Sequence, residues 1–375
     1  MFEQRLSEAF AALGMFNLLV VGKTGVGKST LVNAMFGSDV AQTGIGEPVT
    51  KGLTHYVLPD SFLGLYDAEG FETGVAGDEI LEGLRSLVSL NSTKPAEQHI
   101  HAVWYLVRWS DRRFEQAQMS FVNTLIELNL PVIIVLTQVP TKDGQIHPDA
   151  REFADFIDGL GLGVAGPAVI TNALEDQFSS SPVYGLQALL NSTFAIVPLV
   201  AEKALTAAQI IDLGRKKKAV DAIIKQACTF AVGVGATPIP FADAALLIPN
   251  QITMIARITA AYGLPPSRSR AMSVAGSIVL TGGATMAGRY AVTGLLKFIP
   301  GGAIAGSAIS ATVAGTLTKA VGLAWSQVCE LALGLDEKQR DQFWASGKVA
   351  EQFLVFFKQN PGTRTSLIRR VTKRA

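Results

Sequence analysis

The stretch Gly22-Lys23-Thr24-Gly25-Val26-Gly27-Lys28-Ser29 decides how the first half of this 375-residue chain is expected to fold. It fits the pattern G-x-x-x-x-G-K-[ST], a glycine-rich loop that holds nucleotide phosphates. An apolar run at 17–21 precedes it and is typical of a buried parallel strand. Residues 29–36 follow with helical character, and Gly37 is placed to end that helix. A strand, a loop and a helix in this order argue against a chance glycine-rich turn.

The loop predicts an anion site because its glycines let backbone N–H groups turn inward at a helix N-terminus, where the helix dipole favours negative charge. Lys28 is expected to reach the β and γ phosphates, and the hydroxyl of Ser29 to bind Mg²⁺. Further along, Asp67-Ala68-Glu69-Gly70 follows a predicted strand. This D-x-x-G arrangement predicts that Asp67 reaches the surroundings of the Mg²⁺ and that the N–H of Gly70 senses the γ-phosphate.

Periodicity along the rest of the first half predicts strands alternating with helices, and therefore a doubly wound, mostly parallel sheet of the α/β class. Segment 38–52 is rich in glycine and polar residues and is expected to be a mobile loop. Ligand-binding loops then gather at the carboxyl ends of the strands. The expected strands are 53–58, 62–66, 100–107, 131–136 and 168–171, and the expected helices are 114–129 and 149–160.

Composition limits the possible functions. The formal net charge is +1, which argues against a general nucleic-acid binder. Hydrophobic residues make up 49% and charged residues 17%, and the mean hydropathy is +0.32, so a membrane-associated part is a candidate. The two cysteines, Cys228 and Cys329, have neither zinc-site nor disulfide-framework spacing and fit buried thiols in a reducing cytoplasm.

The N-terminus has Glu3 and Glu8 among its apolar residues and is not expected to be a signal peptide. Its apolar residues recur at helical spacing, which predicts an amphipathic helix packing on the nucleotide domain. Composition changes near Pro198, where an all-α half of helical hairpins is expected to begin. The expected segments are 1–14 (the N-terminal helix), 15–197 (the nucleotide domain), 198–335 (a Gly/Ala-rich helical domain) and 336–375 (a C-terminal helix and basic tail).

The second half carries long stretches without charge, at 271–288 and 298–318, which reach the length of a membrane-spanning helix, roughly 17–25 residues. Their small residues suit helix packing in a membrane, and they equally suit a soluble bundle. Prolines at 238, 240, 249 and 300 are expected to divide the region into hairpins. The basic cluster 215–218 and the basic tail from Thr363 flank it and favour the anionic cytoplasmic leaflet. We therefore expect a cytoplasmic protein associated with the inner face of the cell membrane.

The last helix is expected to begin after Asp336, which is placed as an N-cap with Gln339 three residues later. The same helix is expected to run to Asn360, where Pro361-Gly362 stops it.

The motifs of residues 15–195 resemble those of P-loop GTPases, in particular the Era-like and immunity-related branches. Gly22–Ser29 resembles their first motif, Pro48-Val49-Thr50 their switch I segment, and Asp67–Gly70 their third motif. The run 100–105 is also typical of Era-like relatives. The second half resembles an uncharacterised bacterial membrane-linked helical domain often fused behind such GTPases, at 238–243, 254–257, 262–265 and 298–302.

The resemblance implies GTP and GDP as ligands with Mg²⁺ as cofactor. The implied nucleotide-binding residues are Thr24, Gly25, Val26, Gly27, Lys28, Ser29, Thr30, Gly70, Thr137, Gln138, Asn172 and Ala173. The implied Mg²⁺ ligands are Ser29 and, in the triphosphate state, Thr50, with Asp67 behind them. Thr54 is the alternative to Thr50.

Two positions depart from the family pattern. The guanine-reading motif N/T-K-x-D is represented by Thr137-Gln138-Val139-Pro140, with proline in place of the aspartate, and the last base motif by Thr171-Asn172-Ala173. By analogy with bidentate base readout, the loss is about 1–3 kcal/mol of discrimination, so guanine preference is expected to be weak. Phe71 stands where Ras-like enzymes place a water-orienting glutamine.

The sequence therefore leaves the catalytic residues unassigned. Glu69 and Arg108 are candidates, and a solvated switch residue and a strand-end charge are the simpler interpretations. The expected function is a regulatory GTPase with slow hydrolysis. Its nucleotide state is expected to change the conformation of the switch segments 38–52 and 68–77. These segments would then control the C-terminal helices at a membrane or in a homodimer or oligomer. The alternatives are a nucleotide-dependent structural module with negligible turnover and a P-loop ATPase. No nucleic-acid partner is expected.

Overall fold

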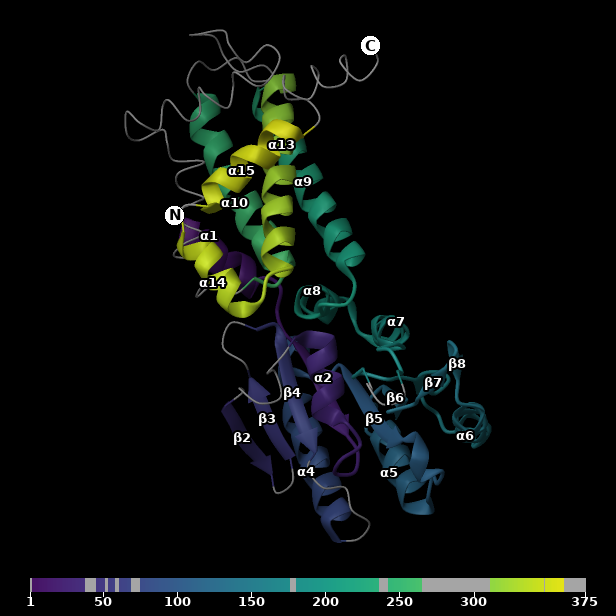
Figure 1. Ribbon diagram of the computed structural model, residues 1–375. Coiled ribbons are helices and arrows are strands. Elements are labelled where there is room, and N and C mark those ends of the chain that lie inside the picture. The colour runs from purple at the N-terminus through teal and green to yellow at the C-terminus, as the bar shows by residue number, and fades with distance from the viewer. Residues whose placement is uncertain are drawn as a thin grey trace. The chain divides into compact units, whose positions relative to one another are not determined.

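The computed structural model describes residues 2–37, 45–50, 53–57, 61–68, 75–175, 180–235, 242–264, 311–346 and 348–360 (Figure 1). The chain divides into two compact units. The first, the sheet unit, spans Gly14–Leu213. The second, the helical unit, combines Met1–Leu13 with Gly214–Ala375. The four segments expected from the sequence remain predictions. The boundaries between the two compact units lie elsewhere, after Leu13 and after Leu213.

The sheet unit is built on a sheet whose described strands follow the order β2-β3-β4-β1-β5-β6-β9. The run from β4 to β9 is parallel, whereas β2 and β3 pair antiparallel at the edge. A separate short hairpin is formed by β7 (Thr141–Lys142) and β8 (Gln145–Ile146). The strands of the sheet are β1 (Phe16–Val21), β2 (Ile45–Thr50), β3 (Leu53–Val57), β4 (Leu63–Ala68), β5 (Ala102–Arg108), β6 (Val132–Thr137) and β9 (Val169–Ile170).

Helices cover both faces of this sheet. One core joins alternate residues of the strands to α4, α5 and α6. On the other face Trp104 of β5 stacks on Phe36 of α2, with ring centroids 5.8 Å apart, and donates from its indole to Thr193 of α7 at 3.1 Å. The helices of this unit are α2 (Lys28–Phe36), α4 (Val75–Asn91), α5 (Gln116–Glu127), α6 (Pro148–Gly159), α7 (Leu186–Ile196) and α8 (Leu199–Ala208), with 3₁₀ turns η1 (Ala96–Gln98) and η2 (Trp109–Asp111).

The expected doubly wound α/β fold, followed by a helical region, is confirmed. Every residue of β1 and of β6 is buried, as expected for strands covered on both faces. The sequence did not predict α4 and α7. It also expected a loop over 38–52, whereas residues 45–50 form β2 and pair with β3. An edge strand containing Gly46 and Pro48 has little local β signal, so pairing with its neighbour decides its conformation.

Helix α8 lies in the region expected to belong to the helical half, but it packs on β1, β4 and η1. Ala201, Ala204 and Leu205 are fully buried in that packing. Their spacing places them on one face of α8. Since α8 belongs to the sheet unit, the composition change near Pro198 precedes the boundary between the two units, after Leu213, by about four helical turns.

The helical unit uses both ends of the chain. Helix α1 packs against α10, and α13 packs against α10, α14 and α15. Leu6 and Ala9 of α1 are buried. The expectation that α1 packs on the nucleotide domain is therefore wrong, because its apolar stripe is covered by a helix about 240 positions further along. The described helices are α1 (Phe2–Ala11), α9 (Leu213–Gly235), α10 (Ala242–Ala261), α13 (Ala311–Leu333), α14 (Glu337–Ala345) and α15 (Lys348–Gln359).

Two further expectations about this unit are corrected. Pro249 lies inside α10 and does not divide it. The single helix expected from Asp336 to Asn360 is two helices, because the backbone becomes extended at Ser346, the C-cap of α14. The predicted N-cap is confirmed, since the carboxylate of Asp336 accepts a hydrogen bond from the Gln339 N–H at 2.8 Å.

No helix of the described residues is long and apolar enough to cross a membrane. The uncharged stretch 271–288, most of the stretch 298–318 and the basic tail from Thr363 lie outside the described residues. Their expected association with a membrane remains a prediction.

The basic cluster 215–218 is not a free basic patch. Lys216 is only 2% exposed, and its ammonium donates to the carbonyl of Tyr262 at 3.0 Å, at the C-terminal end of α10. Lys217 forms an ion pair with Glu330 of α13 at 2.9 Å, and the same carboxylate group accepts from the Tyr262 hydroxyl at 2.9 Å. These two lysines of α9 link that helix to α10 and α13, because Lys216 donates to a carbonyl at the end of α10 and Lys217 pairs with a carboxylate of α13.

Because Lys216 is buried, the stability of the helical unit is expected to depend on pH. Burial lowers the pKa of Lys216 to about 7, whereas the unfolded chain holds this proton up to its ordinary pKa of about 10.4. Between these pH values the unfolded state binds more protons, so stability rises with pH across that window, and below it Lys216 adds no pH dependence. Chemical unfolding at pH 7, 8 and 9 should show this rise, and Lys216→Met should remove it.

Lys218→Met is the matched control, since Lys218 is exposed on the same helix. Arg215, Lys217 and Glu330 are the other charged groups near Lys216 in the described residues. Burial also raises the pKa of the neighbouring Tyr262. These groups are present in all three proteins, so the difference between wild type and variant isolates Lys216. Equal pH slopes for wild type and Lys216→Met would reject the assignment.

Candidate functional site

The glycine-rich loop lies between the end of β1 at Val21 and the start of α2 at Lys28. Gly25 and Gly27 have left-handed backbones, with φ of 78° and 95°. Gly22 lies against β5, where an added Cβ would come within 2.8 Å of the Leu106 carbonyl oxygen. Glycine is thus required at these positions for different reasons, two conformational and one steric.

The helix end that this loop presents is suited to anions. The first bond within α2 runs from the Leu31 N–H to the Gly27 carbonyl at 2.9 Å. The N–H groups of Lys28, Ser29 and Thr30 precede it and have no acceptor within the helix. They lie at the positive end of the helix dipole, which is the arrangement that binds phosphate.

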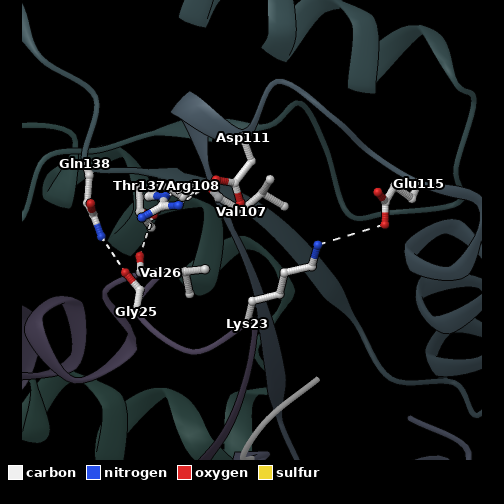
Figure 2. A network of polar contacts seen from close by, with 9 residues as sticks. All are labelled: Lys23, Gly25, Val26, Val107, Arg108, Asp111, Glu115, Thr137 and Gln138. Carbon is white, nitrogen blue, oxygen red and sulfur yellow. Dashed lines mark hydrogen bonds and ion pairs between the residues drawn. The ribbon is translucent and has the colours of Figure 1, made fainter. Parts of the chain in front are cut away.

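Three side chains hold the carbonyl groups of the loop. Lys28 donates to the Gly22 carbonyl at 2.8 Å. Thr137, the last residue of β6, and Gln138, which follows it, donate to the carbonyls of Val26 at 2.6 Å and Gly25 at 2.9 Å, as Figure 2 shows. Because these carbonyls have partners, the loop can direct its N–H groups toward a ligand. The structure therefore gives Thr137 and Gln138 a supporting contact with the loop, and their predicted contact with the base remains a prediction.

Exposed charges surround the loop. The ammonium of Lys23 lies 3.9 Å from the carboxylate of Glu115, and both side chains are partly exposed. Arg108, at the end of β5, pairs with Asp111 at 3.0 Å (Figure 2). This local partner fits the interpretation of Arg108 as a strand-end charge. Glu69, Gly70 and Phe71 lie outside the described residues.

The expected Mg²⁺ ligands fit this ion by their chemistry, because hydroxyl and carboxylate oxygens are what Mg²⁺ prefers. Ser29 is the second residue of α2 and is exposed. Asp67 is the last but one residue of β4 and lies beside Val20 of β1 in the parallel pair. No group of three or more His, Cys, Asp or Glu side chains in the described residues could hold a metal ion. Mg²⁺ sites at nucleotides commonly take one or two protein ligands together with phosphate oxygens and water.

The choice between Thr50 and Thr54 remains open. Thr54 of β3 lies directly opposite Asp67 of β4 in the antiparallel pair, so both belong to the same face of the sheet. Thr50 ends β2 opposite Leu53, and its side chain is outside the described residues.

Of the expected base-contact residues, Thr137 ends β6 and Gln138 begins the loop after it, whereas Asn172 and Ala173 belong to the loop after β9. Residues 176–179 lie outside the described residues. Asn172 and Tyr184 form a bridge in which each backbone N–H donates to the other carbonyl, at 3.1 and 3.0 Å. Asn172 is buried, and Ala173 follows it half-buried. Sequence reasoning missed Tyr184 and Ser181 as anchors of these loops, because only long-range hydrogen bonds reveal their roles.

Comparison with known proteins agrees with this division of the chain. Residues 17–138 match a family model described as a 50S ribosome-binding GTPase. Residues 200–348 match a model described as a domain of unknown function, DUF697. The two expected family resemblances are confirmed at this level, while the membrane link of the second remains a prediction.

One curated relative is cell division control protein 10 of Saccharomyces cerevisiae, 24% identical over 146 residues. The match takes 32% of this chain and 45% of that protein, so the chain spans less than half the length of this relative.

Solved structures that match include a probable GTP-binding protein engB, at 18% identity and a TM-score of 0.32, covering 48% of this chain and 97% of that one. Two Era structures cover 58% of this chain and 68% of theirs. The Aquifex aeolicus Era bound to GDP·AlF₄⁻ is 19% identical with a TM-score of 0.33. Era in complex with MgGDPNP and part of the 16S ribosomal RNA is 18% identical with a TM-score of 0.31. That RNA complex gives no support to the expected absence of a nucleic-acid partner, which stays an untested expectation for this chain.

Proposed function

We propose that this chain, a P-loop GTPase domain followed by a DUF697 domain, is a regulatory protein that binds GTP with Mg²⁺ and hydrolyses it slowly. The nucleotide state controls the helical unit. The observation that carries the proposal is the loop between β1 and α2, where two left-handed glycines and three occupied carbonyl groups leave the N–H donors at the start of α2 for a triphosphate. Lys28, which holds the Gly22 carbonyl, lies in the same loop.

Phosphate binding and hydrolysis would use different groups. Lys28 and the first N–H groups of α2 bind the phosphates, and Ser29 and Asp67 are the residues that would hold Mg²⁺, which neutralises charge on the phosphates. Phe71 has no polar group with which to orient water. Hydrolysis is therefore slow in a single copy and depends on a group supplied from outside the domain.

The topology supports control of the helical unit. The chain leaves that unit after α1, forms the whole sheet unit and returns to the helical unit at α9. The sheet unit is thus inserted into the helical unit, and two short connections, 12–15 and 209–212, join them. A change in the nucleotide domain can reach the helices through both connections.

We further propose that the protein acts at the cytoplasmic face of a membrane, where a second copy completes the hydrolytic site. Lys218 is exposed, and the tail from Thr363 contains five basic residues and no acidic one. Attraction to anionic lipid would raise the local concentration of copies. The burial of Lys216 makes the tail the stronger of the two basic segments.

Turnover measurements test this proposal. With the full chain, GTP turnover per molecule should rise with protein concentration and should rise further with phosphatidylglycerol vesicles, but not with phosphatidylcholine vesicles. Lys28→Ala controls for contaminating activity. Fast turnover in dilute solution, indifferent to lipid and concentration, would contradict the need for a second copy. Bound nucleotide without turnover under any of these conditions would favour the structural module.

A further inference from the structure

The connection 209–212, between the end of α8 and the start of α9, carries an inference about how nucleotide controls the helical unit. The inference rests on the proposed nucleotide-binding function. Gln209, the first residue of this connection, is fully buried, and its N–H donates to the Leu205 carbonyl of α8 at 3.1 Å. Further bonds fix the connection to α2 and α7, so it is held within the sheet unit until α9 begins.

The C-terminal end of α2 is bonded directly to the connection. The Ile210 N–H donates to the carbonyl of Met35 at 3.0 Å. Met35 is the last but one residue of α2, and the last four carbonyls of a helix have no partner within it. One of them, that of Asn33, accepts from the Gly37 N–H at 2.9 Å. The connection satisfies another, so α2 ends on the segment that leads into α9.

The opposite end of α2 is the phosphate loop, where Gly27 is the N-cap and the first N–H groups face the proposed phosphates. α2 has nine residues, so its two ends are about 14 Å apart. Helix formation is cooperative, and a ligand that stabilises the first turn of such a short helix also stabilises its last turn. The phosphate site and the Ile210 bond are therefore the two ends of one helix.

Side chains close the connection into a compact turn. The amide of Gln209 donates to the Asp212 carbonyl at 2.9 Å, and its oxygen accepts from the Asp212 N–H at 2.6 Å. Gln187 of α7 donates to the Asp212 carboxylate at 3.2 Å. Because Gln209 is buried, opening this turn would leave polar groups without partners and is costly. A displacement at Ile210 is thus passed on to Asp212.

α9 follows the connection without a spacer. Leu213 begins this helix directly after Asp212. Lys216, about one turn further, is anchored in the helical unit by its bond to the Tyr262 carbonyl of 3.0 Å. Within residues 210–216 the chain therefore passes from a bond on α2 to a bond at the end of α10.

We propose that α2 and the connection 209–212 transmit the nucleotide state to α9, with the bond from Ile210 to Met35 as the link. A triphosphate on the phosphate loop stabilises α2, keeps the Met35 carbonyl in place and holds the connection closed. Loss of the nucleotide loosens the end of α2, opens this bond more often and frees the first turns of α9. This route is separate from the switch segments 38–52 and 68–77 and from the connection 12–15.

Hydrogen–deuterium exchange of the full chain tests the proposal. Exchange is followed by mass spectrometry in the presence of Mg²⁺, with and without a non-hydrolysable GTP analogue. The analogue should slow exchange of the Ile210 N–H and of the first turns of α9 by about fivefold or more, the lower end of the usual coupling between two sites. Titration of the same analogue measures its affinity.

Ile210→Pro breaks the link, because proline has no N–H to donate. Gln209 before it is extended, with φ −70° and ψ 151°, as a residue preceding proline requires. The response of α9 should disappear, and by reciprocity the affinity should fall by about the same fivefold factor. Ile210→Ala is the matched control, since it keeps the N–H and truncates a side chain that is 53% exposed, so its response should equal that of wild type.

A second variant decides the matter if Ile210→Pro does not fold. Two glycines inserted between Asp212 and Leu213 keep every bond of the connection and add about 7 Å of slack before α9. The analogue should then still protect the Ile210 N–H, whereas the response of α9 should be lost.

The other outcomes separate this inference from the proposed function. If α9 responds to the analogue in Ile210→Pro, or across the glycine insertion, as it does in wild type, the signal takes another route. The inference is then wrong and the proposed function stands. If wild type binds the analogue and α9 does not respond, control of the helical unit fails and the inference fails with it. If wild type does not bind the analogue, the proposed nucleotide binding itself is wrong.

Discussion

Lys28→Ala is expected to weaken the binding of GTP and ATP by about 100-fold or more. In the proposed nucleotide complex the ammonium would face two phosphates, and each charge-assisted hydrogen bond is worth about 1.5–3 kcal/mol. Two such bonds correspond to at least two powers of ten in affinity. The substitution also removes the bond from Lys28 to the Gly22 carbonyl, 2.8 Å long, which helps to hold the loop. Isothermal titration with each nucleotide in the presence of Mg²⁺ measures the effect.

Lys23→Ala is the matched control for this prediction. Lys23 belongs to the same loop and carries the same charge, but its partner is the carboxylate of Glu115, 3.9 Å away, and the two side chains are 35% and 43% exposed. Such an exposed ion pair is worth at most about 1 kcal/mol, so the affinity should change only a few-fold. Equal losses in the two variants would mean that general positive charge, and not the geometry of the phosphate loop, binds the nucleotide.

Leu6→Ala is expected to destabilise the helical unit, although residue 6 lies just before the nucleotide domain in the sequence. Leu6 is 1% exposed, and its helix α1 packs against α10. Removing a buried leucine side chain costs about 2–5 kcal/mol, because burial is lost and a cavity remains. Thermal unfolding should resolve the two units, and added nucleotide with Mg²⁺ should raise the transition of the sheet unit, which binds it. Leu6→Ala should lower the other transition.

Leu354→Ala is the control within the same unit. This leucine lies on α15 and is 40% exposed, so the same truncation removes less buried surface and should cost clearly less. The assignment of α1 to the helical unit is wrong if Leu6→Ala lowers the nucleotide-sensitive transition and spares the other one.

The elements that sequence reasoning found share a strong local signal. β6 is a run of six buried residues between a proline and a polar turn, and its character is visible without knowledge of its neighbours. The N-cap of α14 depends on Asp336 and Gln339, three residues apart. α4 was not predicted even though it is 17 residues long, and it begins inside the segment 68–77 that was expected to be a switch.

The site residues divide in the same way. Gly25, Gly27 and Lys28 are predicted from eight consecutive residues, and in the structure both glycines are left-handed and Lys28 begins α2, while their contact with a nucleotide remains a prediction. Thr137 and Gln138 were predicted as base contacts from family resemblance, whereas their observed bonds run to the phosphate loop more than 100 residues away. No local pattern shows this, because the contact exists only after β1 and β6 are placed in one sheet.

By itself the sequence determined the α/β class, the phosphate loop and the change to a helical second half. These follow from backbone preferences of glycine, from the period of apolar residues and from the geometry of a single helix end, all of which act over a few residues. Tertiary structure alone decided that α1 belongs with α10, that Lys216 lies inside the protein and that Asn172 is engaged with its own loop. An amphipathic helix, a lysine and an asparagine each permit several partners, and the free energy of burial and of long-range hydrogen bonds selects among them.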